Sequence, residues 1–195
     1  MNYKSFIFEN YRYVDSSSTL ALIYRFDRGP RFEEKLIFDF AQRELTQAER
    51  EVLDRIFRLV FLMAGVSYYK AFVSETLICE AFPLDRATAG FIQNLYEKGL
   101  AEFAFTNGIS LRDHLEVRST AVPSITPIAL ELPQRACVPV GGGKDSIVSI
   151  ECLKHAGEPV ILFALGDAEP ISACIAAAQL PFIRSVAGST RSSSG

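Results

Sequence analysis

Apolar and polar positions alternate along the first part of the chain. Aromatic and β-branched residues recur at roughly every second position in three runs, which turn-forming stretches at 15–18 and 27–30 separate. A period of two is typical of strands that bury one face, and clusters of Asp, Ser, Gly and Pro are typical of turns. The pattern predicts three antiparallel strands within residues 3–40.

The hydrophobic period changes from two to between three and four after these strands. Thr46 and Glu49 have the spacing of a capping box, in which each side chain bonds the other residue's backbone amide. Apolar residues then recur every three or four positions as far as Gly65. We expect an amphipathic helix that covers the small sheet.

A second helix is predicted from an Asp85 cap to Lys98. Gly99 follows it at the place where a left-handed terminating residue is favoured. The aromatic run at 102–107 is interpreted as a structural strand without a chemical role.

The chain changes character after residue 120. Prolines in the stretch 121–133 favour an extended connector. Beyond it, apolar runs alternate with helical spacings, which indicates a parallel sheet. The elements expected there are a strand at 136–140, a helix at 144–155, a strand at 160–165, a helix at 171–179 and a strand at 181–186.

The predicted fold class is α/β, divided into four parts. An α+β N-terminal domain with a small antiparallel sheet occupies 1–120, and the connector occupies 121–133. An incomplete parallel-sheet domain occupies 134–186. Residues 187–195 are small and polar, so we expect a disordered tail that cannot complete the sheet.

Composition excludes several classes of function. A net charge of −3 gives no basic surface for nucleic acid or an anionic membrane. The longest apolar stretch, 56–66, is about half a bilayer crossing and contains Arg58, so no membrane span is expected. Four dispersed cysteines indicate reduced, cytoplasmic thiols, and two histidines without metal-ligand spacing argue against a zinc site.

A glycine-rich loop between the strand at 136–140 and its helix carries the candidate chemistry. Three glycines bring several amides to one point at the positive end of a helix dipole, which forms an anion site. A lysine adds a charge for phosphate, a serine adds a hydroxyl, and an aspartate can cap the helix or help to hold Mg²⁺. The residues are Gly141, Gly142, Gly143, Lys144, Asp145 and Ser146.

Two familiar phosphate loops do not fit these residues. A Walker A loop requires glycine at the position of Val138 and Ser or Thr at the position of Asp145. A dinucleotide-binding fingerprint requires a third glycine where Ser146 stands. An ordinary flexible turn is the remaining structural alternative, although it would not need a glycine triplet beside Lys and Ser.

The segment 140–149 resembles the Ser-Gly-Gly-x-Asp-Ser loop of the ATP pyrophosphatase superfamily. The resemblance implies an ATP pyrophosphatase-like domain that binds ATP on a parallel sheet, releases pyrophosphate and transfers AMP to a substrate oxygen. Gly141 stands where that superfamily usually has serine.

A narrower resemblance covers the chain from Phe6 to about Phe182. The runs 64–71, 99–108 and 141–151 are similar to those of the UDP-N-acetylmuramoyl-L-alanyl-L-glutamate epimerases of peptidoglycan synthesis, in which the loop also begins with glycine. This implies a cytoplasmic isomerase that inverts the terminal L-glutamate of UDP-MurNAc-L-Ala-L-Glu, with ATP and Mg²⁺, through an acyl adenylate.

The resemblance suggests roles for two groups of residues. The glycines 141–143 with Lys144 and Ser146 would hold pyrophosphate, and Asp145 would support the metal. The catalytic candidates are Tyr68, Tyr69 and Lys70, because phenol and amine groups transfer protons once their pKa values are shifted. Packing is an equal alternative for the tyrosines. His114 is a weaker base candidate.

Two other functions stay open. An adenylating ligase or tRNA-modifying ATP pyrophosphatase uses the same loop, although such enzymes usually add an RNA-binding module or a reactive cysteine pair. An inactive, truncated fragment is the other, because only three parallel strands are counted where about five are normal. In that case the open edge beside 136–140 would need another chain to supply the missing C-terminal half.

Overall fold

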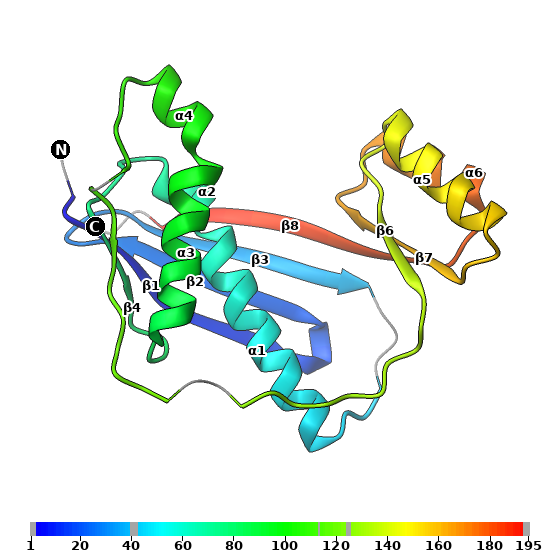
Figure 1. Ribbon diagram of the computed structural model, residues 1–195, viewed down its shortest axis with the longest axis horizontal. Helices are drawn as coiled ribbons and strands as arrows, with labels where there is room; N and C mark the ends of the chain where they lie inside the picture. The colour runs from blue at the N-terminus through cyan, green and yellow to red at the C-terminus, as the bar shows by residue number, and fades with distance from the viewer. Residues whose placement is uncertain (1–2, 40–42, 113, 124–125, 193–195) are drawn as a thin grey trace.

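The computed structural model describes residues 3–39, 43–112, 114–123 and 126–192. Within these residues one mixed sheet of eight strands has the order β5-β4-β1-β2-β3-β8-β7-β6 (Figure 1). The strands are β1 (Ser5–Val14), β2 (Thr19–Phe26), β3 (Arg31–Asp39), β4 (Thr76–Cys79), β5 (Glu116–Val117), β6 (Ala136–Pro139), β7 (Val160–Leu165) and β8 (Phe182–Ser192). The predicted α/β fold class is confirmed, because the described residues combine one mixed sheet with helices.

Helices flank the sheet on both faces. They are the short 3-10 helix η1 (Asp15–Ser17), α1 (Gln47–Ala64), α2 (Val66–Tyr69), α3 (Arg86–Gly99), α4 (Ala101–Thr106), α5 (Lys144–His155) and α6 (Glu169–Ala178). Among the described residues, no helix combines the length and the apolar content that a membrane crossing requires.

The three predicted N-terminal strands are confirmed. β1, β2 and β3 form an antiparallel meander, which the parallel strands β4 and β5 extend beyond β1. Alternate residues of β2 point to opposite faces, so one face of that strand is fully buried. That buried row is Leu20, Leu22, Tyr24 and Phe26.

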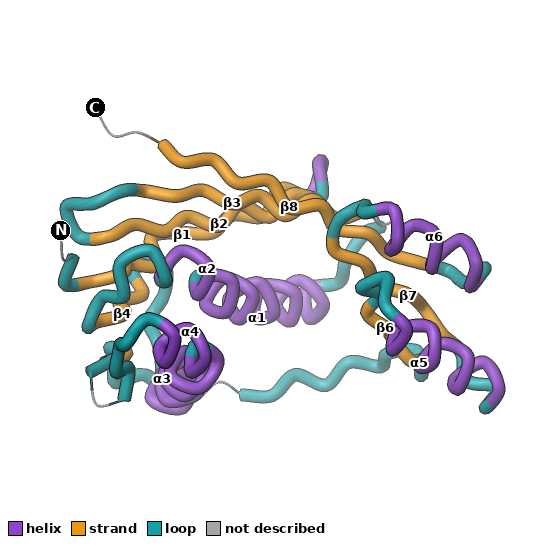
Figure 2. The backbone as a smooth tube through the Cα atoms, turned by 90° about the horizontal axis from the view of Figure 1, so that it is seen from above, coloured by secondary structure: helices purple, strands orange, loops and turns teal. Residues whose placement is uncertain are grey.

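Helices α1 to α4 lie on one face of the meander (Figure 2). The ring of Phe61 on α1 stacks on Tyr24 at 5.1 Å between centroids and meets the edge of Phe8 at 5.5 Å. Tyr24 donates a hydrogen bond to the Phe61 carbonyl at 2.9 Å. This aromatic cluster holds the N-terminal half together.

Both predicted helix caps are present. The Thr46 hydroxyl accepts a hydrogen bond from the Glu49 amide at 3.3 Å, and the Glu49 carboxylate accepts one from the Thr46 amide at 2.8 Å. Asp85 accepts hydrogen bonds from the amides of Ala87 and Thr88 at the start of α3. These caps satisfy backbone donors that a helix leaves free at its first turn.

We expect Thr46→Ala to lower the free energy of unfolding by about 1 kcal/mol, because the capping box loses one of its two hydrogen bonds. Urea denaturation followed by circular dichroism measures the change. Thr120→Ala is the control, since Thr120 is exposed and caps no helix. Equal stability of the two variants would show that the cap contributes nothing.

The second half alternates strand and helix, as predicted. β6, β7 and β8 are parallel neighbours, and α5 and α6 connect them. Val138, Leu162 and Ile175 belong to a hydrophobic cluster separate from the one under α1. β6 lies at the end of the strand order, so the described sheet has an edge there.

The two groups of helices lie on opposite faces of the sheet. Ser185 of β8 pairs with Phe38, whose side chain packs on the α1 side. Arg184, the residue before it, bonds the Ser172 hydroxyl of α6 at 3.3 Å. Because successive residues of a strand face opposite ways, α6 covers the face that α1 does not.

The prediction that the chain from residue 187 lies outside the sheet is wrong for 187–192. β8 continues through these residues and pairs with β3 from Asp39↔Arg184 to Arg31↔Ser192. Backbone hydrogen bonds make this pairing and need no apolar side chains, which is why composition did not reveal it. Residues 193–195 lie outside the described residues.

Two local predictions near α4 are also wrong. The run predicted as a strand at 102–107 forms helix α4 instead, and only Ala104 is buried in it. Phe105 is 89% exposed, so the aromatic alternation does not reflect burial of one strand face. Gly99 belongs to α3 and has no positive φ, because the chain passes through Leu100 directly into α4.

Candidate functional site

The glycine loop joins β6 to α5, as the sequence predicts. Gly143 is the N-cap of α5, with extended backbone at φ −94° and ψ 170°. No side chain of the described residues accepts a hydrogen bond from the first-turn amides of α5, so these amides can bond another acceptor. A twelve-residue helix adds its positive dipole end at the same point. This arrangement suits an anion such as phosphate.

Gly142 fixes the loop against α6. Its φ is +79°, a backbone conformation that residues with a side chain rarely adopt. A Cβ atom there would lie 2.8 Å from the carbonyl carbon and from the Cβ of Pro170. Gly141 and Gly143 have open space at the same position. Only the middle glycine is therefore required by the geometry of the loop.

The polar residues of the motif lie close together around the loop. The Gly141 amide donates to the Ser146 hydroxyl at 3.2 Å, which closes the loop onto the first turn of α5. Lys144 and Asp145 are both exposed. The lysine thus has access to an anion, while the Ser146 hydroxyl proton can be donated to a ligand.

The residues present fit a phosphate better than a metal cage. Asp145 is the one carboxylate in the motif, and the described residues contain no group of three or more His, Cys, Asp or Glu side chains that could hold a metal ion. Mg²⁺ commonly takes one or two protein carboxylates and completes its shell with phosphate oxygens and water. A role for Asp145 beside a bound nucleotide stays a prediction.

The three catalytic candidates Tyr68, Tyr69 and Lys70 lie away from the glycine loop. They also differ from one another in how deeply they are buried. Figure 1 places α2 beside α1 and α3, away from α5. Tyr69 is fully buried, and its hydroxyl donates to the Ser74 carbonyl at 2.9 Å. Burial raises the pKa of Tyr69 well above its ordinary value. Tyr68 is half-buried and Lys70 is exposed, so these two are accessible to a ligand.

His114 lines a small cavity of about 200 Å³ beside Tyr69 and Ser74. The Ser74 hydroxyl is buried and has no hydrogen-bond partner among the described residues. This cavity lies at the start of β4 and β5, where Glu75 and His114 precede the strands. It is a different place from the glycine loop.

An acid on β3 was not singled out from the sequence. Phe32, Leu36 and Phe38 pack toward α1, and Glu34 has the same parity along the strand, so it lies on that inner face too. Burial raises the pKa of Glu34, and a hydrogen bond with Tyr68 offsets part of the rise. The break in the apolar row was the sequence feature that could have identified it.

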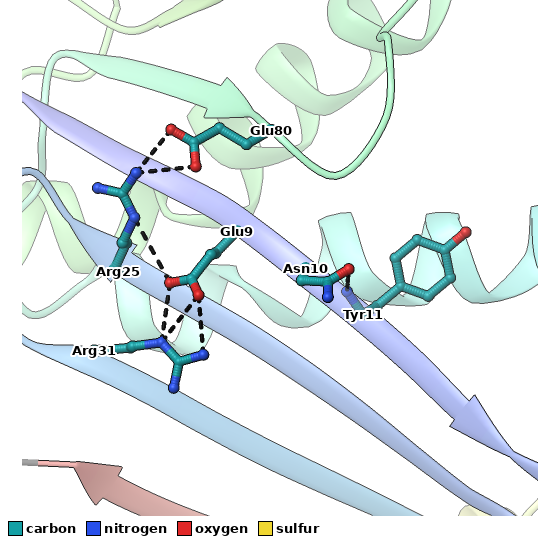
Figure 3. Close-up of polar contacts among 6 residues, drawn as sticks. All are labelled: Glu9, Asn10, Tyr11, Arg25, Arg31 and Glu80. Atoms are coloured by element: carbon teal, nitrogen blue, oxygen red, sulfur yellow. Dashed lines mark hydrogen bonds and ion pairs between the residues drawn. The ribbon is translucent and has the colours of Figure 1, made fainter.

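The outer face of the meander carries paired charges. Glu9 binds Arg31 at 2.9 Å and lies 3.6 Å from Arg25, which also bonds Glu80 at 2.7 Å (Figure 3). Glu9 stands at the irregularity in β1 between Phe8 and Asn10. Because carboxylates neutralise both guanidinium groups, this network favours a structural role over anion binding.

Comparison with known proteins gives a consistent match. The family model described as the MurL N-terminal domain matches residues 1–187. A UDP-N-acetyl-alpha-D-muramoyl-L-alanyl-L-glutamate epimerase from Xanthomonas oryzae pv. oryzae is 36% identical over 171 residues, which cover 87% of this chain and 38% of that protein. Proteins of the same name from a Micromonospora species and Salinispora tropica are 35% and 33% identical, with 83% and 91% of this chain and 37% and 39% of theirs covered. The chain thus spans less than two fifths of these relatives. No solved structure matches it.

Proposed function

Because the chain belongs to the MurL N-terminal domain family, we propose that it takes part in epimerising the terminal L-glutamate of UDP-MurNAc-L-Ala-L-Glu during peptidoglycan precursor synthesis. The observation that carries the proposal is the Gly142 loop, with its uncapped helix start and exposed Lys144. The proposed co-substrate is ATP with Mg²⁺, and the proposed location is the cytoplasm.

The chemistry explains why a phosphate loop would serve an epimerase. The α-proton beside a free carboxylate is very weakly acidic, because its loss places a second negative charge on the same group. Conversion of the carboxylate to an acyl adenylate removes the first charge and lets the carbanion spread into an enolate. Deprotonation, reprotonation on the other face and hydrolysis then give D-glutamate.

The loop residues would act on the departing pyrophosphate. First-turn amides and the Ser146 hydroxyl donate hydrogen bonds, and Lys144 supplies a positive charge where negative charge develops. Asp145 would hold Mg²⁺ together with phosphate oxygens. Lys70 and Tyr68 stay candidates for substrate contact, whereas Tyr69 has a packing role in the core.

We further propose that the site is completed by a polypeptide equivalent to the remaining part of the longer relatives. Ala136 and Val140 donate hydrogen bonds to the β7 side, so by alternation the peptide groups of Cys137 face the open edge of β6. On the face opposite α5 and α6, Leu165 is 57% exposed. An added strand and an apolar cover fit this edge and face.

The test is release of AMP and pyrophosphate from ATP and Mg²⁺ by the purified chain, with and without UDP-MurNAc-L-Ala-L-Glu, followed by chiral analysis of the glutamate. The AMP assay and the chiral analysis are repeated after addition of the C-terminal remainder of the Xanthomonas relative. We expect substrate-dependent AMP together with D-glutamate. AMP without inversion would identify an adenylating ligase. A folded chain that forms no AMP in either mixture would overturn the proposal.

A further inference from the structure

We propose that the cavity at the start of β4 and β5 binds a free α-amino acid with a short apolar side chain. The inference goes beyond the proposed function and does not depend on it. Three observations carry it: a buried hydroxyl without a partner, a strained residue that places this hydroxyl, and a lining that offers both an acid and an imidazole beside apolar walls.

The Ser74 hydroxyl is the feature that points to a ligand. Ser74 is 2% exposed, and nothing in the part of the chain that the structure describes hydrogen bonds with its hydroxyl. Its carbonyl accepts a hydrogen bond from the Tyr69 hydroxyl at 2.9 Å, which holds the residue in place. A buried polar group without a partner lowers stability, and such groups normally bond water or a ligand. Because Ser74 lines the cavity, its hydroxyl is placed to bond a molecule inside it.

The residue before Ser74 has an unfavourable backbone. Val73 has a φ of +51°, in a region that β-branched residues rarely adopt. Its amide donates to the Tyr69 carbonyl at 3.0 Å, which closes the turn after α2. Glycine would remove the strain if this turn served only to connect α2 with β4. The strained turn sets the position of Ser74, and Val73 itself lines the cavity.

The size of the cavity selects a small ligand. Its volume of about 200 Å³ is far above the ~15 Å³ that one water molecule needs. It is below the ~300 Å³ at which pockets for drug-sized ligands begin. The expected ligand is therefore larger than water and smaller than a nucleotide.

The lining matches the two charged groups of an amino acid. Glu75 can accept hydrogen bonds from an ammonium group, and the imidazole of His114 can donate to a carboxylate. The Ser74 hydroxyl both donates and accepts, so it can bond either group. Ile109 and Leu111 supply apolar wall, against which a short alkyl side chain would pack. L-Alanine meets these requirements and is the probe for the site.

NMR spectra of the ¹⁵N-labelled chain with L-alanine test the site. We expect the amides of Ser74, Glu75 and Leu111 to shift, while those of the glycines 141–143 keep their positions. N-Acetyl-L-alanine lacks the ammonium group and L-alaninamide lacks the carboxylate, so each should bind at least about 10-fold more weakly. Equal binding of either analogue, or no shift of the cavity amides with L-alanine, would overturn the inference.

Inorganic pyrophosphate separates this site from the proposed function. We expect it to shift the amides of the glycines 141–143 and to leave those of the cavity unchanged. Absence of that response would count against the proposed function alone, because the cavity shares no residue with the loop.

Glu75→Gln keeps the size of the side chain and removes its charge, so L-alanine binding should weaken at least about 10-fold. Glu116→Gln is the matched control. Glu116 is an exposed acid that pairs with Thr76 from the neighbouring strand and does not line the cavity. It should bind L-alanine like wild type.

Ser74→Ala separates binding from folding. Loss of a buried hydroxyl without a partner should leave the melting temperature of the ligand-free chain at or above that of wild type. The affinity for L-alanine should fall about 10-fold. Wild-type affinity in Ser74→Ala or in Glu75→Gln would overturn the inference, and the cavity would then hold water only. A lower melting temperature of Ser74→Ala with unchanged affinity would make the hydroxyl structural and overturn it as well.

Discussion

Alanine in place of Gly142 is expected to cost about 3 kcal/mol or more of the free energy of unfolding and to reduce AMP formation at least about 100-fold. Alanine would have to adopt the left-handed conformation at φ +79°, which is strained for a residue with a side chain. It would also meet the Pro170 carbonyl carbon at 2.8 Å, and a backbone atom cannot move aside as a flexible side chain can. The loop and α6 would have to separate.

Hydrogen exchange locates the damage. We expect the amides of α5 and α6 to lose protection in Gly142→Ala, while those of β1 to β3 keep theirs, because the two halves have separate hydrophobic clusters. Gly143→Ala is the matched control, since a Cβ there meets nothing within 4 Å and φ is −94°. Equal protection in both variants would show that the contact with Pro170 does not hold the loop.

The sequence predicted the strand, loop and helix around Gly142 because local chemistry determines them. A glycine triplet between an apolar run and a helical spacing has few other solutions, and the two capping residues Thr46 and Asp85 act within three residues of themselves. In contrast, β8 beyond residue 186 depends on the free edge of β3, a partner about 150 residues away in the chain. A run of small polar residues does not indicate in the sequence that it pairs with so distant a strand.

The candidate site was predictable in part for the same reason. The loop residues were found from their motif, which is continuous in the sequence. Tyr68 and Tyr69 are neighbours in sequence, yet the short helix α2 turns one toward Glu34 and the other into the core beside Tyr96. The position of Glu34 on the inner face became visible only from the register of β3. Contacts between distant segments therefore decide which polar residues are accessible for chemistry.

Gly65, between α1 and α2, is closely surrounded by aromatic side chains. Gly65 has helical backbone at φ −54°, where alanine is normally the better residue. A Cβ atom, however, would lie 2.6 Å from Phe8 Cε1 and 2.9 Å from the Tyr96 hydroxyl. That hydroxyl donates to the Leu62 carbonyl at 2.9 Å, so movement of the ring would break a buried hydrogen bond.

We expect Gly65→Ala to lower the free energy of unfolding by about 2–4 kcal/mol, from overpacking and the lost hydrogen bond together. Gly90→Ala, on α3, should raise it by about 0.5–1 kcal/mol, because a Cβ there meets nothing within 4 Å and alanine favours the helix. Urea denaturation measures the free energy of unfolding of both variants. The substitution is the same in each, glycine to alanine, and the expected changes have opposite signs. If Gly65→Ala is instead as stable as Gly90→Ala, the aromatic rings can rearrange, and the run 64–71 that resembles the epimerases would need a reason other than packing for its glycine.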